Sequence, residues 1–360
     1  MRCKRIATGS GNDGMALIIT LMIVALLTAA VVEMNRNIRE TVASAALFRD
    51  RVTMSHMIQS GFSIGEAVLI DDRNNTETDS LQEQWADATA LAEIVGEFPF
   101  EEGRVRLQIT DLRSRLQVNA LVDFPGGREF NENQRMLWLR FFELISISQA
   151  QDSNIEPIPI VNAVKDWLDS GDDDATTGLD GAESDYYLDQ TPPYACRNGP
   201  VMDISELALV KGIPPEVFST PHAGYSLVDC VTVFGRTEAA GRDGFTFDGR
   251  ININTAPFFV LSALLPLEDA HLGAELAEYR TEMSDEKYVH DLSRPDWYKN
   301  VPGCEEVTMN ANLVTNRSDF FEIAVTASLH DLQMTRTAAV RRLKDPESGK
   351  IVCQVLSYSE

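Results

Sequence analysis

An uncharged apolar run near the start of the chain constrains its possible folds more than any other feature. The run extends from Met15 to Val32 and is first broken by a charge at Glu33. At about 1.5 Å per residue, an α-helix over these residues is roughly 27 Å long, close to the hydrocarbon thickness of a bilayer. The sequence therefore predicts a helix long enough to cross a membrane.

The segment before this run is short, polar and basic. It contains Arg2, Lys4 and Arg5 against one acidic residue, Asp13, and it ends at Gly14, directly before the apolar run. Positive charge on the N-terminal side favours a cytoplasmic N-terminus. We therefore expect a single-pass protein with its N-terminus in the cytoplasm and everything after Val32 across the membrane.

The glycine lies on the unusual side of the apolar run. An ordinary secretory signal is cleaved after its apolar region, next to small residues, whereas cleavage after Gly14 leaves the helix on the mature chain with Met15 at its N-terminus. This layout resembles the leader of type IV prepilins and pseudopilins. Ile19 stands at the fifth mature position, where most of that family has a glutamate. A plain signal anchor or an uncleaved signal peptide is the alternative.

The composition indicates an exported, folded protein. The formal net charge is −24 and becomes −26 without the three basic residues and one acidic residue of the leader. A surface this acidic repels nucleic acid, which requires clustered Lys and Arg, and it suits calcium or a basic partner surface better. About 300 residues follow the anchor, and 44% of the chain is hydrophobic, enough for two cores rather than a disordered tail.

Cys3 lies in the leader and would be lost with it, so four cysteines remain in the mature chain. Their even number in an oxidising compartment predicts one or two disulfides, with three possible pairings that the sequence leaves open. Their wide spacing argues against a zinc site, and free buried thiols are the alternative. The four are Cys196, Cys230, Cys304 and Cys353.

Periodicity predicts a long helix and a distant set of strands. Apolar residues continue at three- and four-residue steps past the membrane, so the helix should run to about residue 70, weakened at Gly61 and Gly65. Alternation predicts strands at 104–110, 319–326, 334–343 and 351–358. Between them, helical patterns cover 131–146, 158–168, 204–210 and 256–265.

These patterns predict an α+β fold. A pilin-like long N-terminal helix should pack with an antiparallel sheet that is interrupted by a large, mostly helical inserted domain. The expected division is a leader at 1–14, a transmembrane and spine helix at 15–70, a pilin-like head at 71–111 and 318–360, and the insertion at 112–317.

An ordered string of short motifs makes the chain recognisable. The motifs are Asp111-Leu-Arg-Ser-Arg-Leu-Gln-Val-Asn119, Asp166-Trp-Leu-Asp169, Asp180-Gly-Ala-Glu183, Tyr187-Leu188, Pro192-Pro-Tyr194, Asn198-Gly-Pro200, Ser205-Glu-Leu207, Val210-Lys-Gly-Ile213 and Ile251-Asn-Ile-Asn-Thr-Ala-Pro257. From Met15 to the C-terminal strands, the string resembles the minor pseudopilin K family of type II secretion systems. That family also lacks glutamate at the fifth mature position, in agreement with Ile19. Two departures are Cys196, where a basic residue is expected, and Ser184, which separates Glu183 from Asp185.

The resemblance implies a role in protein export rather than catalysis. Prepilin peptidase would cut after Gly14 and methylate Met15, and major pseudopilins would form the filament. A K subunit would cap the filament tip with the minor pseudopilins I and J, with the secretin or exported substrates as further candidate partners. The rival reading is a tip-type minor pilin of a type IV pilus, which shares the leader and the anchor.

The acidic segment from Asp169 to Asp189 contains eight carboxylates and no basic residue. Calcium takes six to eight oxygen ligands, which clustered carboxylates supply, although the EF-hand spacing is absent. A solvated acidic loop is the alternative, but the resemblance favours calcium because relatives bind it in the helical domain. The best candidate ligands are Asp180, Glu183 and Asp185, followed by Asp172 and Asp174.

Other functions find little support in the sequence. Asn252 to Pro257 before an apolar helix is also similar to helix-hairpin-helix DNA-binding modules, but this region has few basic residues to hold phosphates. The five histidines are scattered, and no nucleophile elbow, zincin or phosphate-loop pattern occurs. Three of the four tryptophans are expected in the core, and Trp138 is a candidate exposed contact.

Overall fold

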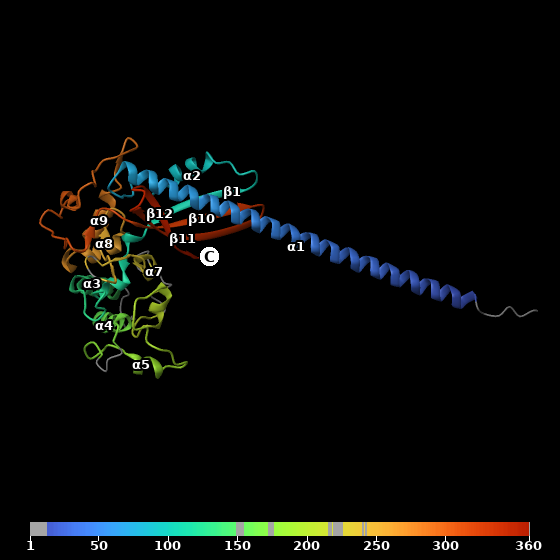
Figure 1. Ribbon diagram of the computed structural model, residues 1–360, viewed down its shortest axis with the longest axis horizontal. Helices are drawn as coiled ribbons and strands as arrows, with labels where there is room; N and C mark the ends of the chain where they lie inside the picture. The colour runs from blue at the N-terminus through green and yellow to red at the C-terminus, as the bar shows by residue number, and fades with distance from the viewer. Residues whose placement is uncertain are drawn as a thin grey trace, which may run out of the picture.

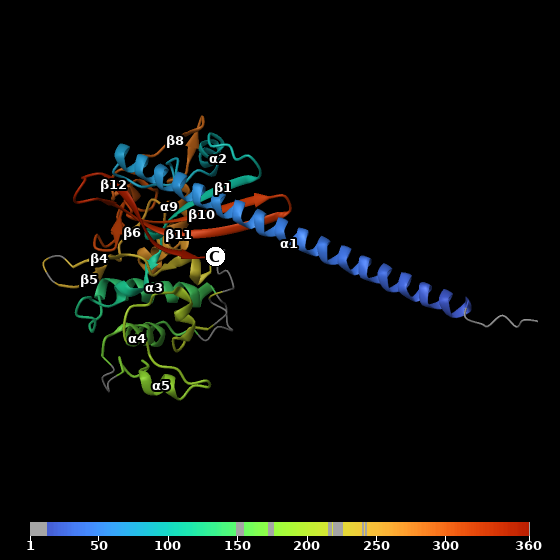
Figure 2. The same ribbon diagram turned by 45° about the vertical axis from the view of Figure 1, so that its right-hand side comes forward.

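The structure is a computed structural model that describes residues 13–148, 155–171, 176–214, 218, 226–239, 241 and 243–359. One long helix, α1, projects from a body that gathers around its C-terminal end (Figure 1). The sheet lies beside this end of the helix, and the inserted helices extend away from it on the other side of the sheet (Figures 1 and 2). This arrangement confirms the predicted α+β fold class.

Helix α1 (Asp13–Asn75) is one unbroken helix of 63 residues. Among the described residues it is the one helix long and apolar enough to cross a membrane, and none of its most apolar window is buried. The predicted helix is confirmed, and it continues five residues beyond the expected end at residue 70.

The second half of α1 packs on the sheet. Its buried face includes Met54, Phe62 and Leu69. Gly61 and Gly65 permit this close approach, since a Cβ at Gly61 would lie 2.5 Å from a Val325 methyl, and one at Gly65 would lie 3.0 Å from an Ile323 methyl. The helix is not interrupted at the two glycines, whose lack of a side chain brings it against strand β10.

The sheet is antiparallel with the strand order β1-β10-β11-β12. Its strands are β1 (Arg104–Asp111), β10 (Phe320–Leu329), β11 (Leu332–Lys344) and β12 (Ile351–Ser359). Leu107 lies opposite Val325, and both side chains are buried. All four predicted strands are confirmed. Helix α2 (Ala88–Gly96), which contacts β1, was not predicted.

The inserted region contains short helices with little sheet. Its α-helices are α3 (Glu132–Ser148), α4 (Pro157–Leu168), α5 (Ser184–Leu188), α7 (Leu227–Cys230), α8 (Phe258–Leu264) and α9 (Leu272–Tyr279). Its 3₁₀ helices are η1 (Leu112–Ser114), η2 (Val118–Leu121), η3 (Ile204–Leu209), η4 (Leu267–Asp269) and η5 (Trp297–Asn300). The helix expected at 204–210 is thus a 3₁₀ helix.

Eight short strands, none of them predicted, also lie in the described part of this region. They are β2 (Leu116–Gln117), β3 (Val231–Thr232), β4 (Arg236–Glu238), β5 (Phe245–Phe247), β6 (Ile251–Asn252), β7 (Met283–Ser284), β8 (Lys287–Tyr288) and β9 (Val314–Thr315). They pair two by two, and the pairs β2-β3 and β6-β9 are parallel.

Two large hydrophobic cores divide the body. One joins α1, α2 and the four-stranded sheet, and the other lies within the inserted region between Leu116 and Leu313. Trp138 is 1% exposed in the second core, beside Phe141 and Phe142. The prediction of an exposed Trp138 is therefore wrong, because the apolar face of α3 turns inward. The other three tryptophans are buried, as predicted.

Candidate functional site

The N-terminal half of α1 presents apolar side chains on all sides. Gly14 and Met15 lie in its first turn, and Ile19 is 51% exposed. Every described side chain from Gly14 to Phe48 is exposed, so the rest of the described chain does not cover this segment. Such a surface is suited to lipid or to the helices of other subunits.

An apolar stripe continues beyond the membrane-length segment. Met34, Ile38, Val42 and Phe48 are each more than half exposed, and Phe48 reaches 71%. Successive residues of the stripe are four, four and six residues apart along α1, and the head does not cover them. An apolar stripe with this spacing is typical of helix–helix packing, so the stripe is a candidate contact for neighbouring spine helices.

A buried carboxylate cluster lies where α4 meets the acidic segment. Asp166, Asp169 and Glu183 bring oxygen atoms within 4.8 Å of one another, and all three residues are buried. The first two come from the end of α4, and Glu183 directly precedes α5. We call this the α4 cluster.

Backbone amides and one lysine balance the α4 cluster. The Asp166 carboxylate accepts hydrogen bonds from the backbone N–H groups of Thr177 (3.0 Å) and Ala182 (2.9 Å), and burial raises its pKa. Lys165 Nζ donates to Asp169 Oδ2 at 2.6 Å. Gly181 is required here, since a Cβ at this position would lie 2.0 Å from Asp166 Oδ2. The cluster thus contains three hard oxygen donors and one resident cation.

The predicted calcium ligands are only partly brought together. Glu183 joins the α4 cluster, whereas Asp180 and Asp185 are exposed and stay outside it. Asp172 and Asp174 lie outside the described residues. The sequence reasoning missed Asp166 and Asp169, although their three-residue spacing at the end of a predicted helix places both on one face.

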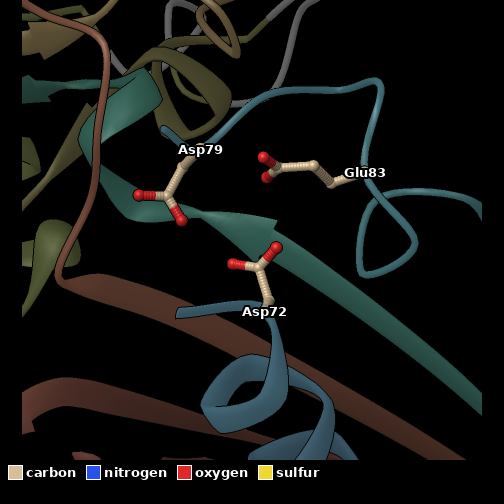
Figure 3. Close-up of side chains that lie close together, drawn as sticks. All are labelled: Asp72, Asp79 and Glu83. Atoms are coloured by element: carbon tan, nitrogen blue, oxygen red, sulfur yellow. The ribbon is translucent and has the colours of Figure 1, made fainter. Parts of the chain in front are cut away.

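A second carboxylate cluster lies at the end of α1. Asp72, Asp79 and Glu83 point toward one another, the first from the last turn of the helix and the others from the loop that follows (Figure 3). The side chain of Arg342, on β11, is 1% exposed and binds both aspartates. Its Nη1 donates to Asp72 Oδ2 at 2.7 Å, and its Nη2 donates to the Asp79 carboxylate. We call this the α1 cluster.

The α1 cluster is short of positive charge. Burial raises the pKa of the Glu83 carboxyl to about 7, and burial raises that of Asp79 to about 6 despite Arg342. Glu83 accepts hydrogen bonds from Ser80 N at 3.0 Å and from Trp85 Nε1 at 2.7 Å. One guanidinium therefore faces three carboxylates, and the Glu83 carboxyl, with its pKa near 7, is only about half ionised at neutral pH.

Two of the sequence motifs meet at the joint between the cores. The buried Asp111 carboxylate accepts hydrogen bonds from Asn252 Nδ2 (2.8 Å) and Thr255 Oγ1 (2.6 Å). Asn252 also donates to the backbone carbonyl of Asp79 at 3.0 Å. The motif that is similar to DNA-binding modules therefore has a structural task, because its polar side chains fasten the insertion to the head.

The expected disulfides are not formed. Cys196, Cys230, Cys304 and Cys353 are all free thiols. The first three fill separate places in the inserted core, and Cys353 packs beside the core of the head. Burial raises the pKa of the Cys196, Cys230 and Cys353 thiols to about 12, so these side chains act as small apolar residues.

Comparison with known proteins finds a matching family model and similar sequences. Residues 114–220 match the family described as Type II secretion system (T2SS), protein K. Type II secretion system protein K of Pseudomonas aeruginosa is 25% identical over 351 residues, covering 95% of this chain and 91% of the relative. The protein of the same name from Klebsiella pneumoniae is 23% identical over 209 residues, covering 57% and 59% of the two chains.

A solved structure shares the fold. The match is to a chain in the crystal structure of the GspK-GspI-GspJ complex from the enterotoxigenic Escherichia coli type 2 secretion system. It covers 86% of this chain and 96% of the other at 17% identity, with a TM-score of 0.60. The comparisons do not favour the type IV pilus alternative. The chain is thus similar to type II secretion system protein K along almost its whole length.

Proposed function

We propose that this chain is a minor pseudopilin that caps the tip of a type II secretion pseudopilus, together with the minor pseudopilins I and J. It acts by assembly rather than by catalysis and so supports protein export across the outer membrane. The observation that carries the proposal is the shared fold, over 86% of this chain, with a protein whose structure was solved in complex with GspI and GspJ.

The shape and chemistry of α1 support a place at the tip. In a filament of this kind, a glutamate at the fifth mature position neutralises the N-terminal amine of a neighbouring subunit within the membrane. An unpaired charge there costs at least about 2.5 kcal/mol. Ile19 has no charge to offer a neighbour, and the inserted region adds bulk beside the spine (Figure 2). Both features suit a subunit with no further subunit above it.

The route to the filament follows from the N-terminus. Prepilin peptidase would cleave between Gly14 and Met15 and methylate the new N-terminus. The chain would wait in the inner membrane with its N-terminus in the cytoplasm and its body in the periplasm, before α1 packs with the major pseudopilin. The exposed stripe from Met34 to Phe48 supports such packing.

A calcium ion at the α4 cluster is part of the proposal. Asp166, Asp169 and Glu183 offer three buried carboxylates, a donor type that calcium prefers. Lys165 now partly neutralises them, so calcium would have to displace its ammonium from Asp169. Calcium would tie the acidic segment to the end of α4 and thereby order this surface of the insertion.

The proposal is tested by co-purification. The full chain, tagged and extracted in detergent, should retain the I and J subunits of its own secretion system in equal amounts. Failure to retain them would remove the tip-complex assignment.

Matched variants locate the contact. Phe48→Glu puts a charge into the exposed stripe of α1 and should reduce retention about tenfold or more, because a buried unpaired carboxylate opposes helix packing. Leu179→Glu, at a residue that is 98% exposed on the insertion, serves as the control and should have no effect. Equal retention by both variants would contradict a role for the stripe.

A further inference from the structure

A groove of about 650 Å³ lies between the four-stranded sheet and the inserted region, away from both carboxylate clusters. Arg341 on β11 and Gln354 and Leu356 on β12 line one side, and Arg236 on β4 and Phe245 on β5 line the other. We call it the arginine groove. Arg197 also lines it, and Glu238 is the one carboxylate among the described residues of the lining.

Two arginines in the groove have no carboxylate partner among the described residues. The Arg236 guanidinium lies 4.1 Å from the centre of the Phe245 ring, and that of Arg341 lies 5.5 Å from the centre of the Phe320 ring. By contrast, Arg197 already pairs with Glu206 and donates to a backbone carbonyl. Nε of Arg341 is buried without a hydrogen-bond partner.

This pairing pattern is unexpected in so acidic a protein. The chain has 55 acidic residues against 31 lysines and arginines, so carboxylates are abundant for pairing elsewhere. Arginines that lie on aromatic rings keep their planar donor groups oriented and available for a carboxylate, which they bind in a two-pronged geometry. The missing acidic partner can therefore come from another polypeptide.

The adjoining strand offers main-chain hydrogen bonds to such a partner. β12 is the last strand of the sheet, and its outer edge pairs with no other strand in the described part of the chain. Residues 351–359 contain no charge and no proline, and the strand is mostly exposed from Gln354 onward. Exposed edges are usually protected by charges or proline, whereas an unprotected edge can accept an added strand.

We infer that the arginine groove docks an acidic, extended segment of a partner protein. The carboxylates of the segment pair with Arg236 and Arg341, its apolar side chains lie on Phe245 and Leu356, and its backbone runs beside β12. This inference does not rest on the proposed function, since it requires only that a partner chain presents acidic and apolar side chains in alternation.

A pair of short peptides tests the chemistry. We use the full chain in detergent and an acetylated, fluorescent eight-residue peptide of alternating glutamate and valine, with a lysine and valine peptide of equal length as comparison. The acidic peptide should bind at least about tenfold more tightly, measured by fluorescence anisotropy at physiological salt. Equal binding of both peptides, or no binding of the acidic one, would overturn the inference.

Charge reversal then tests the location. Arg236→Glu changes an exposed residue, so the fold should persist, and the affinity for the acidic peptide should fall about tenfold. Arg106→Glu, at an exposed position on β1 at the opposite edge of the same sheet, is the matched control and should bind like the unaltered chain. If both variants lose affinity equally, peptide binding depends only on the net charge of the protein, and the groove is not the site.

Discussion

The two carboxylate clusters look alike in composition but are neutralised in different ways. The α1 cluster is bound by Arg342, whose guanidinium reaches two aspartates from a strand of the sheet and is itself almost fully buried. The α4 cluster is bound by Lys165, whose flexible ammonium lies one residue from Asp166 and contacts chiefly Asp169.

This difference indicates different tasks. Arg342 also donates to the backbone carbonyls of Leu69 and Ser318, so it joins the end of α1, the following loop and the sheet. Without the Arg342 side chain, these carbonyls and the two aspartates would lose a hydrogen-bond partner. Lys165 makes contacts with nearby residues of its own helix, and its ammonium can turn toward solvent. The α1 cluster therefore serves as a clamp, and the α4 cluster is the better place for an exchangeable cation.

Removing the arginine should have the largest effect. Arg342→Met leaves the buried Asp79 and the half-buried Asp72 without their guanidinium, and breaking a buried ion pair in this way costs about 3–5 kcal/mol of the free energy of unfolding. Urea unfolding of the full chain in detergent, followed by tryptophan fluorescence, measures it. Arg106→Met, at an exposed position of the sheet, should change the value by less than about 0.5 kcal/mol. A similar small loss in both variants would show that the α1 cluster is no clamp.

Replacing Lys165 should strengthen calcium binding at the α4 cluster. If calcium binds the α4 cluster, the unaltered chain gains about 2.7 kcal/mol at a hundred times the dissociation constant, seen as a higher melting temperature that a chelator reverses. Lys165→Met removes the competing cation, so its melting temperature should be lower in chelator but rise more steeply with calcium.

Conservative substitutions separate the two sets of candidate ligands. Glu183→Gln and Asp166→Asn should abolish the calcium-dependent rise in melting temperature, whereas Asp180→Asn and Asp185→Asn should leave it intact, since these side chains stay outside the cluster. The reverse pattern would favour the ligands chosen from the sequence. If calcium does not raise the melting temperature of the unaltered chain, the metal proposal is wrong.

The contrast between the clusters also shows what the sequence could predict. Helix α1 and the four main strands follow from local periodicity, because alternation and three- to four-residue steps are visible within each segment. Glu183 could also be chosen from the sequence, because it lies inside an obvious acidic segment. Arg342 and Asp79 are different, because they are 263 residues apart and nothing in either neighbourhood indicates the other.

Two other errors have a similar physical origin. Four cysteines in an even number favour disulfides only if the fold brings them together, and here each fills a separate packing site. Trp138 lies in a helix whose apolar face could serve a core or a partner, and only the position of α8 decides between them, because Phe259 of that helix packs on Phe141 beside it. Long-range packing, which local pattern does not contain, decided both cases.

The smallest predicted effect is the pH dependence of the α1 cluster. The pKa of the Glu83 carboxyl rises from its ordinary value of 4.5 to about 7, chiefly because it is buried and further because Asp72 lies nearby. A carboxyl with a higher pKa in the folded state binds more protons when folded, so the free energy of unfolding falls as the pH rises from about 4.5 to about 7. The stabilisation is thus complete in acid and is lost as Glu83 ionises.

Glu83→Gln removes this titration while its amide oxygen can still accept hydrogen bonds from Ser80 and Trp85. The variant should melt a few degrees higher than the unaltered chain at pH 8 and show almost no difference at pH 5, because the parent carboxyl is then largely protonated. Gln84→Glu, at the next position in the same loop, is exposed and should not reproduce this pattern. A constant difference between Glu83→Gln and the parent from pH 5 to pH 8 would contradict a raised pKa, and with it the shortage of positive charge that distinguishes the α1 cluster.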